Sequence, residues 1–490
     1  MTMDTAQPIL IRFFLAFILA VALVPLCRII AKRTGAVAHP RNDRWHRHTI
    51  PLLGGVAIAV ASLVSWAATG IATDLPVLGA TALVISLVGL VDDLLHLKPF
   101  TKLIAQIALA STLVYFDYRL GWLDSRLLDN LVTMLWVVGL TNAFNLLDNM
   151  DGLCAGTALV VAATLLAGFL TGATRDSAGP EIGFLAVLAG AIAGFLVYNF
   201  PPASIFMGDS GSLLLGFSLA ALTLSNEGVR GSRSDVLSVI AGPVFVLLIP
   251  IFDTTLVTVS RLFAGRSPAI GGRDHSSHRL VAIGMSERTA VFVLWSLAAI
   301  GGGIGLFVRS ATQGFSVLVG GLFGIFMCLF ALYLARVRVY DEVVATPVGA
   351  DNITPIPDEF MHKTRVFEVL LDFGVISVSY YAANRLYFDA EAYLRNAETF
   401  YASLPIVVAT QLIAFFTVGT YRGPWHPFNG KDAVRIASGV VLAALAAQLA
   451  MLVFYGSPAV RMVLTIHAAI LFGLMVLSRL ALRLFARLIS

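Results

Sequence analysis

The chain has 490 residues, of which 58% are hydrophobic and 13% are charged, and its formal net charge is +4. Soluble domains carry roughly 25% charged residues, so this composition excludes a soluble globular protein and a disordered one. Three scattered cysteines exclude a disulfide framework and a CxxC metal site. The composition therefore predicts an all-α polytopic membrane protein.

Apolar stretches long enough to span a membrane, about 20 residues each, recur along the chain. Eleven precede residue 336, near 9–30, 53–70, 76–92, 102–117, 130–147, 153–171, 182–200, 212–226, 236–258, 289–308 and 314–335. Four more lie near 366–384, 402–420, 434–455 and 460–484. This spacing predicts a membrane domain at 1–335 with about eleven helices, an acidic proline-containing linker at 336–365, and a C-terminal module at 366–490 with about four.

The short loops differ in their lysine and arginine content. Loops 31–52 and 259–288 carry five such residues each, and the turn after Asp93 carries Lys98 and Lys102, whereas most of the opposite loops carry fewer. Because cytoplasmic loops of membrane proteins are enriched in these residues, the first group is predicted to be cytoplasmic. Counting spans from there places the N-terminus outside, and the linker and C-terminus inside.

Acidic and amide side chains cluster at the ends of several predicted spans. They are Asp92, Asp93, Asn142, Asn145, Asp148, Asp151, Asp209 and Asp253, and the loop after Asp253 adds His275, His278 and Arg279. Ionisable groups near a membrane are costly and usually functional. Under the predicted topology every cluster ends on the cytoplasmic side, whereas carboxylates scattered at random would fall on both sides. The shared side predicts an active site there.

The residue types in these clusters indicate phosphate chemistry. Asn142, Asn145 and Asp148 recur every third residue and share one helix face if the helix extends that far. Carboxylate and amide oxygens suit Mg²⁺, with Mn²⁺ as the alternative, and no Cys/His ligand set favours zinc. Basic groups in the His275 to Arg279 loop suit the outer oxygens of a metal-bound pyrophosphate.

Each motif also has a plainer interpretation. Adjacent aspartates at a helix end are often only solvated, Asp253 could extend to the membrane interface, and His275 and His278 could be ordinary cytoplasmic charges. A transporter or lipid flippase is the rival class of function. Its coupling charges should lie near mid-span in repeated halves, whereas here the charges lie at span ends and no internal repeat is visible.

The same motifs resemble those of the polyprenyl-phosphate N-acetylhexosamine-1-phosphate transferase family. The resembling segments, in the family's order, are 44–46 (RWH), 51–55 (PLLGG), 89–93 (GLVDD), 142–153 (NAFNLLDNMDGL), 206–212 (FMGDSGS), 250–254 (PIFDT) and 274–280 (DHSSHRL). The resemblance covers roughly 10–335. It implies an eleven-helix enzyme of the bacterial inner membrane that moves a sugar 1-phosphate from a UDP-sugar to polyprenyl phosphate, releases UMP, and initiates cell-surface polysaccharide synthesis.

The resemblance also assigns roles to individual residues. It implies a catalytic group of Asp92, Asp93, Lys102 and Asp148, a substrate-binding group of Asp151, Asp209, His275, His278 and Arg279, and Asp253 with Asn145 as Mg²⁺ ligands. The implied partners are a UDP-N-acetylhexosamine, polyprenyl phosphate and the lipid bilayer, with no nucleic acid. UDP-GlcNAc is the expected donor, because the triple-histidine run of the branch using UDP-MurNAc-pentapeptide is missing from 274–279. UDP-MurNAc-pentapeptide and other UDP-aminosugars remain alternative donors.

The C-terminal module resembles, more loosely, the four-helix membrane module of nucleotide-sugar dehydratases and epimerases. The resembling segments are 419–425 (GTYRGPW) and 478–480 (SRL). No dinucleotide-binding glycine motif follows, so we expect a docking element that binds a partner enzyme or a second copy of the chain. Because all the transferase motifs precede Gly284, the sequence predicts that this module is dispensable for chemistry.

Overall fold

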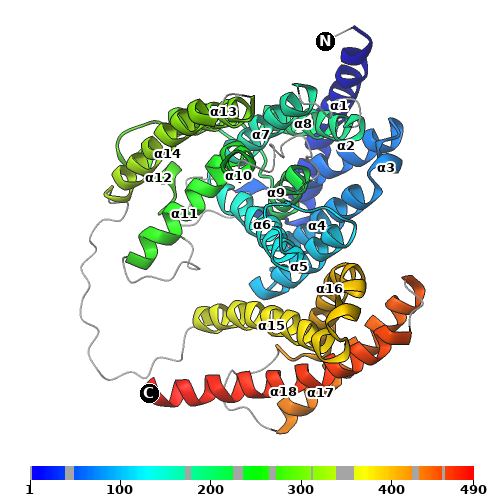
Figure 1. The fold of residues 1–490 in the computed structure, drawn as a ribbon. Coiled ribbons are helices and arrows are strands. Elements are labelled where there is room, and N and C mark those ends of the chain that lie inside the picture. The colour runs from blue at the N-terminus through cyan, green and yellow to red at the C-terminus, as the bar shows by residue number, and fades with distance from the viewer. Residues whose placement is uncertain are drawn as a thin grey trace, which may run out of the picture. The chain divides into compact units, whose positions relative to one another are not determined.

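A computed structural model describes residues 3–38, 49–171, 178–224, 236–263, 272–310, 313–337, 358–421, 430–454 and 458–489. Most of these residues are helical, which confirms the all-α prediction (Figure 1). Three segments singled out in the sequence lie outside the described residues: 44–46, positions 338–357 of the predicted linker, and 422–425.

The helices follow one another with short connections. In the first part of the chain they are α1 (Met3–Thr34), α2 (Gly54–Ala68), α3 (Ile71–Asp74), α4 (Pro76–Leu95), α5 (Pro99–Tyr115), α6 (Arg126–Leu147), α7 (Leu153–Thr171), α8 (Gly179–Asn199), α9 (Asp209–Leu224), α10 (Val236–Val246), α11 (Leu248–Phe263), α12 (Ser276–Ala282), α13 (Glu287–Ser310) and α14 (Gln313–Ala335). Four more follow: α15 (Asp358–Tyr387), α16 (Ala390–Val418), α17 (Gly430–Phe454) and α18 (Pro458–Ile489). Two short strands, β1 (Val37–Ala38) and β2 (Ile50–Pro51), pair antiparallel.

The chain is a polytopic membrane protein. Among the described residues, eight helices are long and apolar enough to cross a membrane, or nine if one bent pair is counted as a span. The predicted total of about eleven plus four stays a prediction. The single span predicted at 236–258 is instead the bent pair α10 and α11, which meet at 82°. Pro250 explains the break, because it has no N–H to donate to the carbonyl of Val246, the last residue of α10.

Contacts divide the chain into two compact units, and the first comprises Met1–His96, Arg119–Asp124 and Leu135–Val348. Helix α9 lies at its centre and packs against α2, α4 and α7. Beyond Asp209 all the residues of α9 are buried, because no charged side chain follows and small residues allow close approach. At Gly216 a Cβ would lie 2.8 Å from the Cα of Thr141, so α6 also approaches α9 backbone to backbone.

The second unit comprises Leu97–Tyr118, Ser125–Met134 and Gly349–Ser490. Here α16 packs against α5, α15 and α17, and α18 packs against α15 and α17. In sequence α5 lies within the predicted 1–335 domain, yet it packs with the helices of the C-terminal module. The predicted domain boundaries themselves stay predictions.

Candidate active site

The segment before α9 is held by backbone contacts with the start of α2. The amides of Gly54 and Gly55 donate to the carbonyls of Phe206 and Met207 at 2.9 and 2.8 Å. Gly208 then turns the chain at φ +73°, a conformation that glycine adopts without strain. A Cβ at Gly208 would also lie 2.6 Å from the Oδ2 atom of Asp93. The glycines therefore allow the carboxylate of Asp93 to reach the first turn of α9.

Asp93, near the end of α4, is bonded to the N-terminus of α9. Its Oδ1 accepts the backbone N–H of Asp209 at 2.8 Å, and its Oδ2 accepts that of Ser210 at 3.0 Å. A carboxylate at this position satisfies amides that have no partner within the helix and complements the helix dipole. Ser86, two turns earlier on α4, adds a bond from its hydroxyl to the Ser210 carbonyl at 2.9 Å.

Asn145 on α6 meets the same turn of α9. Its side-chain amide donates to Oδ1 of Asp209 and to the hydroxyl of Ser212, both at 2.9 Å. Because α6 ends at Leu147, Asp148 lies just beyond the helix rather than on the face that carries Asn145. The structure therefore brings together Asp93, Asn145 and Asp209, three residues that the sequence predicts for the site.

Asp151 and its neighbours shape the loop after α8. The Oδ2 atom of Asp151 accepts the amide of Ala203 at 2.8 Å, and the amide of Gly152 donates to Oδ1 of Asn199 at 3.1 Å. Of the other predicted residues, Asp92 and Asp148 are half-buried in the first unit, and Lys102 is half-buried on α5 in the second.

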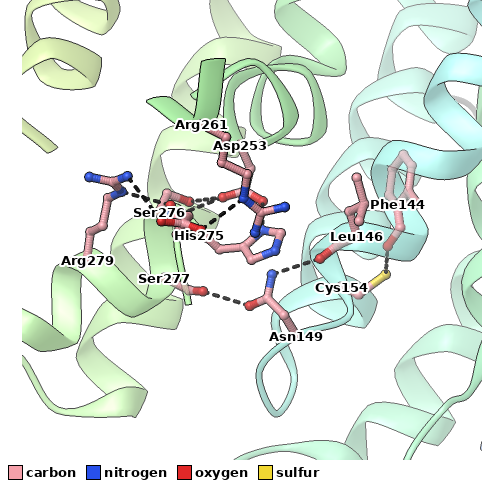
Figure 2. Close-up of polar contacts among 11 residues, drawn as sticks. Phe144, Leu146, Asn149, Cys154, Asp253, Arg261, His275, Ser276, Ser277 and Arg279 are labelled. Carbon is pink, nitrogen blue, oxygen red and sulfur yellow. Dashed lines mark hydrogen bonds and ion pairs between the residues drawn. The ribbon is translucent and has the colours of Figure 1, made fainter. Parts of the chain in front are cut away.

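A second polar cluster forms around Asp253 on α11 (Figure 2). Its Oδ2 atom lies 2.7 Å from Nδ1 of His275, while its Oδ1 accepts the amide and hydroxyl of Ser276 at 2.7 and 2.6 Å. The Asp253 residue is 1% exposed. Burying a carboxylate this deeply requires such bonds. With Nδ1 facing Asp253, Nε2 is the ring atom of His275 that can face a substrate.

The sequence predicts a loop at 259–288, but Ser276–Ala282 forms the helix α12, with His275 just before it. Arg279 on α12 fastens this segment to α14 rather than presenting its charge to solvent. Its Nε donates to the Asp274 carbonyl at 2.7 Å, and its Nη1 donates to carbonyls at the end of α14, including that of Leu334 at 2.8 Å. Asp274 in turn accepts from Nε of Arg261 at 2.9 Å, and both side chains are buried. In this structure Arg279 therefore holds α12 to the end of α14, and its predicted contact with substrate stays a prediction.

The segment that carries the histidines, the start of α12, is tied to the end of α6. The hydroxyl of Ser277 donates to Oδ1 of Asn149 at 2.7 Å, and Asn149 donates to the Leu146 carbonyl at 2.8 Å (Figure 2). This bond brings the segment beside the turn between Asp148 and Asp151. Asn149 is not among the predicted site residues, although it lies inside the NAFNLLDNMDGL motif, because its partner Ser277 lies 128 residues further along the chain.

His278 is a neutral group at neutral pH. Burial, followed by the nearby His275, lowers the pKa of His278 to about 4. The two rings lie 6.2 Å apart, centroid to centroid. His278 can therefore offer a substrate a hydrogen bond rather than a positive charge.

The described residues hold no group of three or more His, Cys, Asp or Glu side chains that could bind a metal ion by themselves. Mg²⁺ does not require such a cage, because it is usually bound by one or two carboxylates, water and substrate phosphates. Asp253 and Asn145 supply oxygen atoms of the kind that Mg²⁺ prefers. In this structure both oxygens of Asp253 are bonded to His275 and Ser276, so the predicted metal contact stays a prediction.

Comparison with known proteins matches residues 75–227 to the family model described as glycosyl transferase family 4. A probable undecaprenyl-phosphate N-acetylglucosaminyl 1-phosphate transferase of Bacillus subtilis is 32% identical over 342 residues, which cover 66% of this chain and 91% of that protein. A decaprenyl-phosphate N-acetylglucosaminephosphotransferase of Mycolicibacterium smegmatis is 37% identical over 302 residues, 55% of this chain and 74% of that protein.

A relative from a second branch is similar over a shorter stretch. The phospho-N-acetylmuramoyl-pentapeptide-transferase of Limosilactobacillus reuteri is 33% identical over 238 residues, which cover 44% of this chain and 73% of that protein. The matched family segment 75–227 contains Asp93, Asn145 and Asp209, so the cluster at the start of α9 lies within it.

Proposed function

The chain belongs to the polyprenyl-phosphate N-acetylhexosamine-1-phosphate transferase family, and we propose that it transfers GlcNAc 1-phosphate from UDP-GlcNAc to polyprenyl phosphate with release of UMP. The observation that carries this proposal is the convergence of the polar motifs. Asp93, Asn145 and Asp209 come from three helices and meet at one turn of α9. Asn149 and Ser277 link that region to the His275 loop.

The reaction is a phosphoryl transfer. An oxygen of the lipid phosphate bonds to the β-phosphorus of the UDP-sugar, the bond from that phosphorus to the bridging oxygen breaks, and UMP leaves with the bridging oxygen. A phosphate monoester has a second pKa near 6, so the acceptor is already largely anionic at neutral pH. Alignment and charge neutralisation therefore matter more than a strong general base.

The proposed roles follow from the contacts. Because both oxygens of Asp93 hold backbone amides of α9, Asp92 is the better candidate for contact with the acceptor phosphate. Lys102 and Asp148 complete the proposed catalytic group, and Asp151 and Asp209 contact the nucleotide. His275 and His278 contribute hydrogen bonds to the pyrophosphate or sugar.

Mg²⁺, with Mn²⁺ as the alternative, would neutralise the pyrophosphate, and Asp253 and Asn145 would hold it. Asp253 also organises the end of the loop that leads into α12, because the same carboxylate holds His275 and Ser276. Its substitution is therefore expected to affect both the metal requirement and the loop.

We further propose that the site faces the cytoplasm of a bacterial inner membrane, with the N-terminus outside and the C-terminus inside. The excess of lysine and arginine in the loops next to the motifs supports this orientation. The dianionic pyrophosphate of a UDP-sugar does not cross a bilayer unaided, so the site must lie on the side where the donor is present.

The test is incubation of the purified full-length protein with polyprenyl phosphate, Mg²⁺ and one donor at a time: UDP-GlcNAc, UDP-MurNAc-pentapeptide or UDP-glucose. We expect a lipid product with the mass of polyprenyl pyrophosphoryl-GlcNAc, together with UMP, from the first donor only. A product from UDP-MurNAc-pentapeptide would move the protein to the other branch. No UMP from any UDP-sugar would refute the transferase proposal and favour a transporter.

A further inference from the structure

Helix α5 carries Lys102 and packs against α15 and α16 of the C-terminal module. Its buried face includes Phe100, Leu103, Ile104 and Ile107. Phe100 and Lys102 lie two residues apart, so their side chains leave the helix on roughly opposite sides. The packing of Phe100 therefore contributes, with the rest of this face, to the rotation of the first turn and the direction of Lys102.

Phe100 is held by two aromatic rings of the C-terminal module. Its ring centroid lies 6.1 Å from that of Tyr421 and 6.5 Å from that of Phe416. Tyr421 reaches Phe100 because α16 ends at Val418 and the next residue, Gly419, adopts φ 81° and turns the chain back. Both Phe100 and Tyr421 are buried, 5% and 3% exposed.

Tyr421 is in turn bonded to a buried charge network between α15 and α18. Its hydroxyl donates to Oδ2 of Asp372 at 3.0 Å. Arg479 donates through Nη2 to both oxygens of Asp372, at 2.9 and 2.8 Å, and its Nη1 lies 3.7 Å from Oε1 of Glu368. Asp372 is fully buried. A buried charge network of this kind has few alternative arrangements, so it holds the Tyr421 hydroxyl in one place.

We propose, on the basis of the proposed function, that Tyr421, Asp372 and Arg479 are positioning residues for the transfer reaction. They act through Phe100 on the first turn of α5 and thereby set the position of Lys102. The C-terminal module is then part of the working transferase, contrary to the sequence prediction that it is dispensable for chemistry.

The first test compares two conservative variants of the full-length protein. Tyr421→Phe removes the hydroxyl that bonds Asp372. Its matched control, Tyr380→Phe, removes an equally buried hydroxyl of the same module that bonds Ser403 instead, at 2.7 Å. We expect Tyr421→Phe to lower kcat about tenfold with little change in KM for the UDP-sugar, since small misplacements are costly. Tyr380→Phe should stay within about twofold of wild type. Equal kcat values for the two variants overturn the proposal.

The second test asks whether the effect passes through Lys102. Tyr421→Phe is combined with Lys102→Ala, and the residual kcat is compared with that of Lys102→Ala alone. Because the two residues are proposed to act as one unit, the second substitution should cost less than about twofold in this background. If the double variant instead shows the full reduction in kcat of each substitution multiplied together, the two residues act independently, and this would overturn the proposal.

Hydrogen exchange of backbone amides in 98–107 tests the mechanical link without any activity measurement. We expect faster exchange in Tyr421→Phe than in Tyr380→Phe and wild type. Unchanged exchange there overturns the proposal, even if activity falls. If instead wild type transfers no sugar phosphate from any donor, the proposed function fails, while a faster exchange would still establish that Tyr421 holds α5.

Discussion

Replacing Asp93 by asparagine tests whether this carboxylate stabilises the fold through α9, in addition to the chemical role proposed for Asp92 and Asp93. The carboxylate accepts two backbone amides of α9, at 2.8 and 3.0 Å. Asparagine keeps one acceptor oxygen but turns an NH₂ group toward the other amide, so one bond to a charged acceptor is lost. Such a bond contributes about 1.5–3 kcal/mol, and the charge at the helix N-terminus about 0.3–1 kcal/mol more.

The free energy of unfolding should therefore fall by about 2–4 kcal/mol in Asp93→Asn. The assay is unfolding of the purified protein in detergent, measured together with turnover and UDP-sugar binding. Asp92→Asn, one residue away on the same helix, is the matched control. We expect both variants to lose turnover while UDP-sugar binding stays measurable, and only Asp93→Asn to lose this much stability. Equal stability of the two variants would show that the bonds from Asp93 to the amides at the start of α9 do not stabilise the protein.

Three further predictions concern the His275 loop. Asp253→Asn should raise the Mg²⁺ requirement and lower turnover at least about 100-fold, and full activity of wild type in excess EDTA would contradict this. Arg279→Lys should lower the melting temperature but leave KM for the UDP-sugar within about twofold, because Arg279 bonds carbonyls at the end of α14. A raised KM at unchanged stability would indicate that Arg279 contacts the substrate instead. The pKa of His278 is lowered to about 4. Between about pH 6.5 and 4 the unfolded chain therefore binds a proton that the folded protein does not, so the free energy of unfolding decreases as the pH is lowered through this range. His278→Gln should flatten that part of the stability curve, and an unchanged curve would show that the residue is not buried as a neutral imidazole.

The sequence predicts the residues of the site better than their bonds. Asp93 and Asn145 are predicted from their positions at span ends, and the structure brings both to α9. That Asp93 binds the amides of Asp209 and Ser210 could not be predicted, because 116 residues separate Asp93 from Asp209 and no local pattern records the contact. Arg279 is a similar case, since its carbonyl partner at Leu334 lies 55 residues further along the chain.

Hydrophobic runs likewise predict that helices exist but not how they pack. The span predicted at 102–117 corresponds to α5, Pro99–Tyr115. Nothing in its apolar pattern indicates that Phe100 meets Tyr421, because many apolar surfaces would fit that face equally well. Pro243 and Pro250 indicate a break in the span that became α10 and α11, because proline cannot donate a backbone hydrogen bond within a helix. The length of the apolar run concealed it.

In the proposed reaction the sugar moves together with its phosphate. UDP-GlcNAc labelled with ³²P in the β-phosphate distinguishes this from transfer of the sugar alone. In the presence of polyprenyl phosphate and Mg²⁺, we expect the label in the lipid fraction and unlabelled UMP in the aqueous fraction. Label recovered in UDP, with unlabelled sugar-lipid formed, would show that the sugar moves alone and would contradict the proposed function.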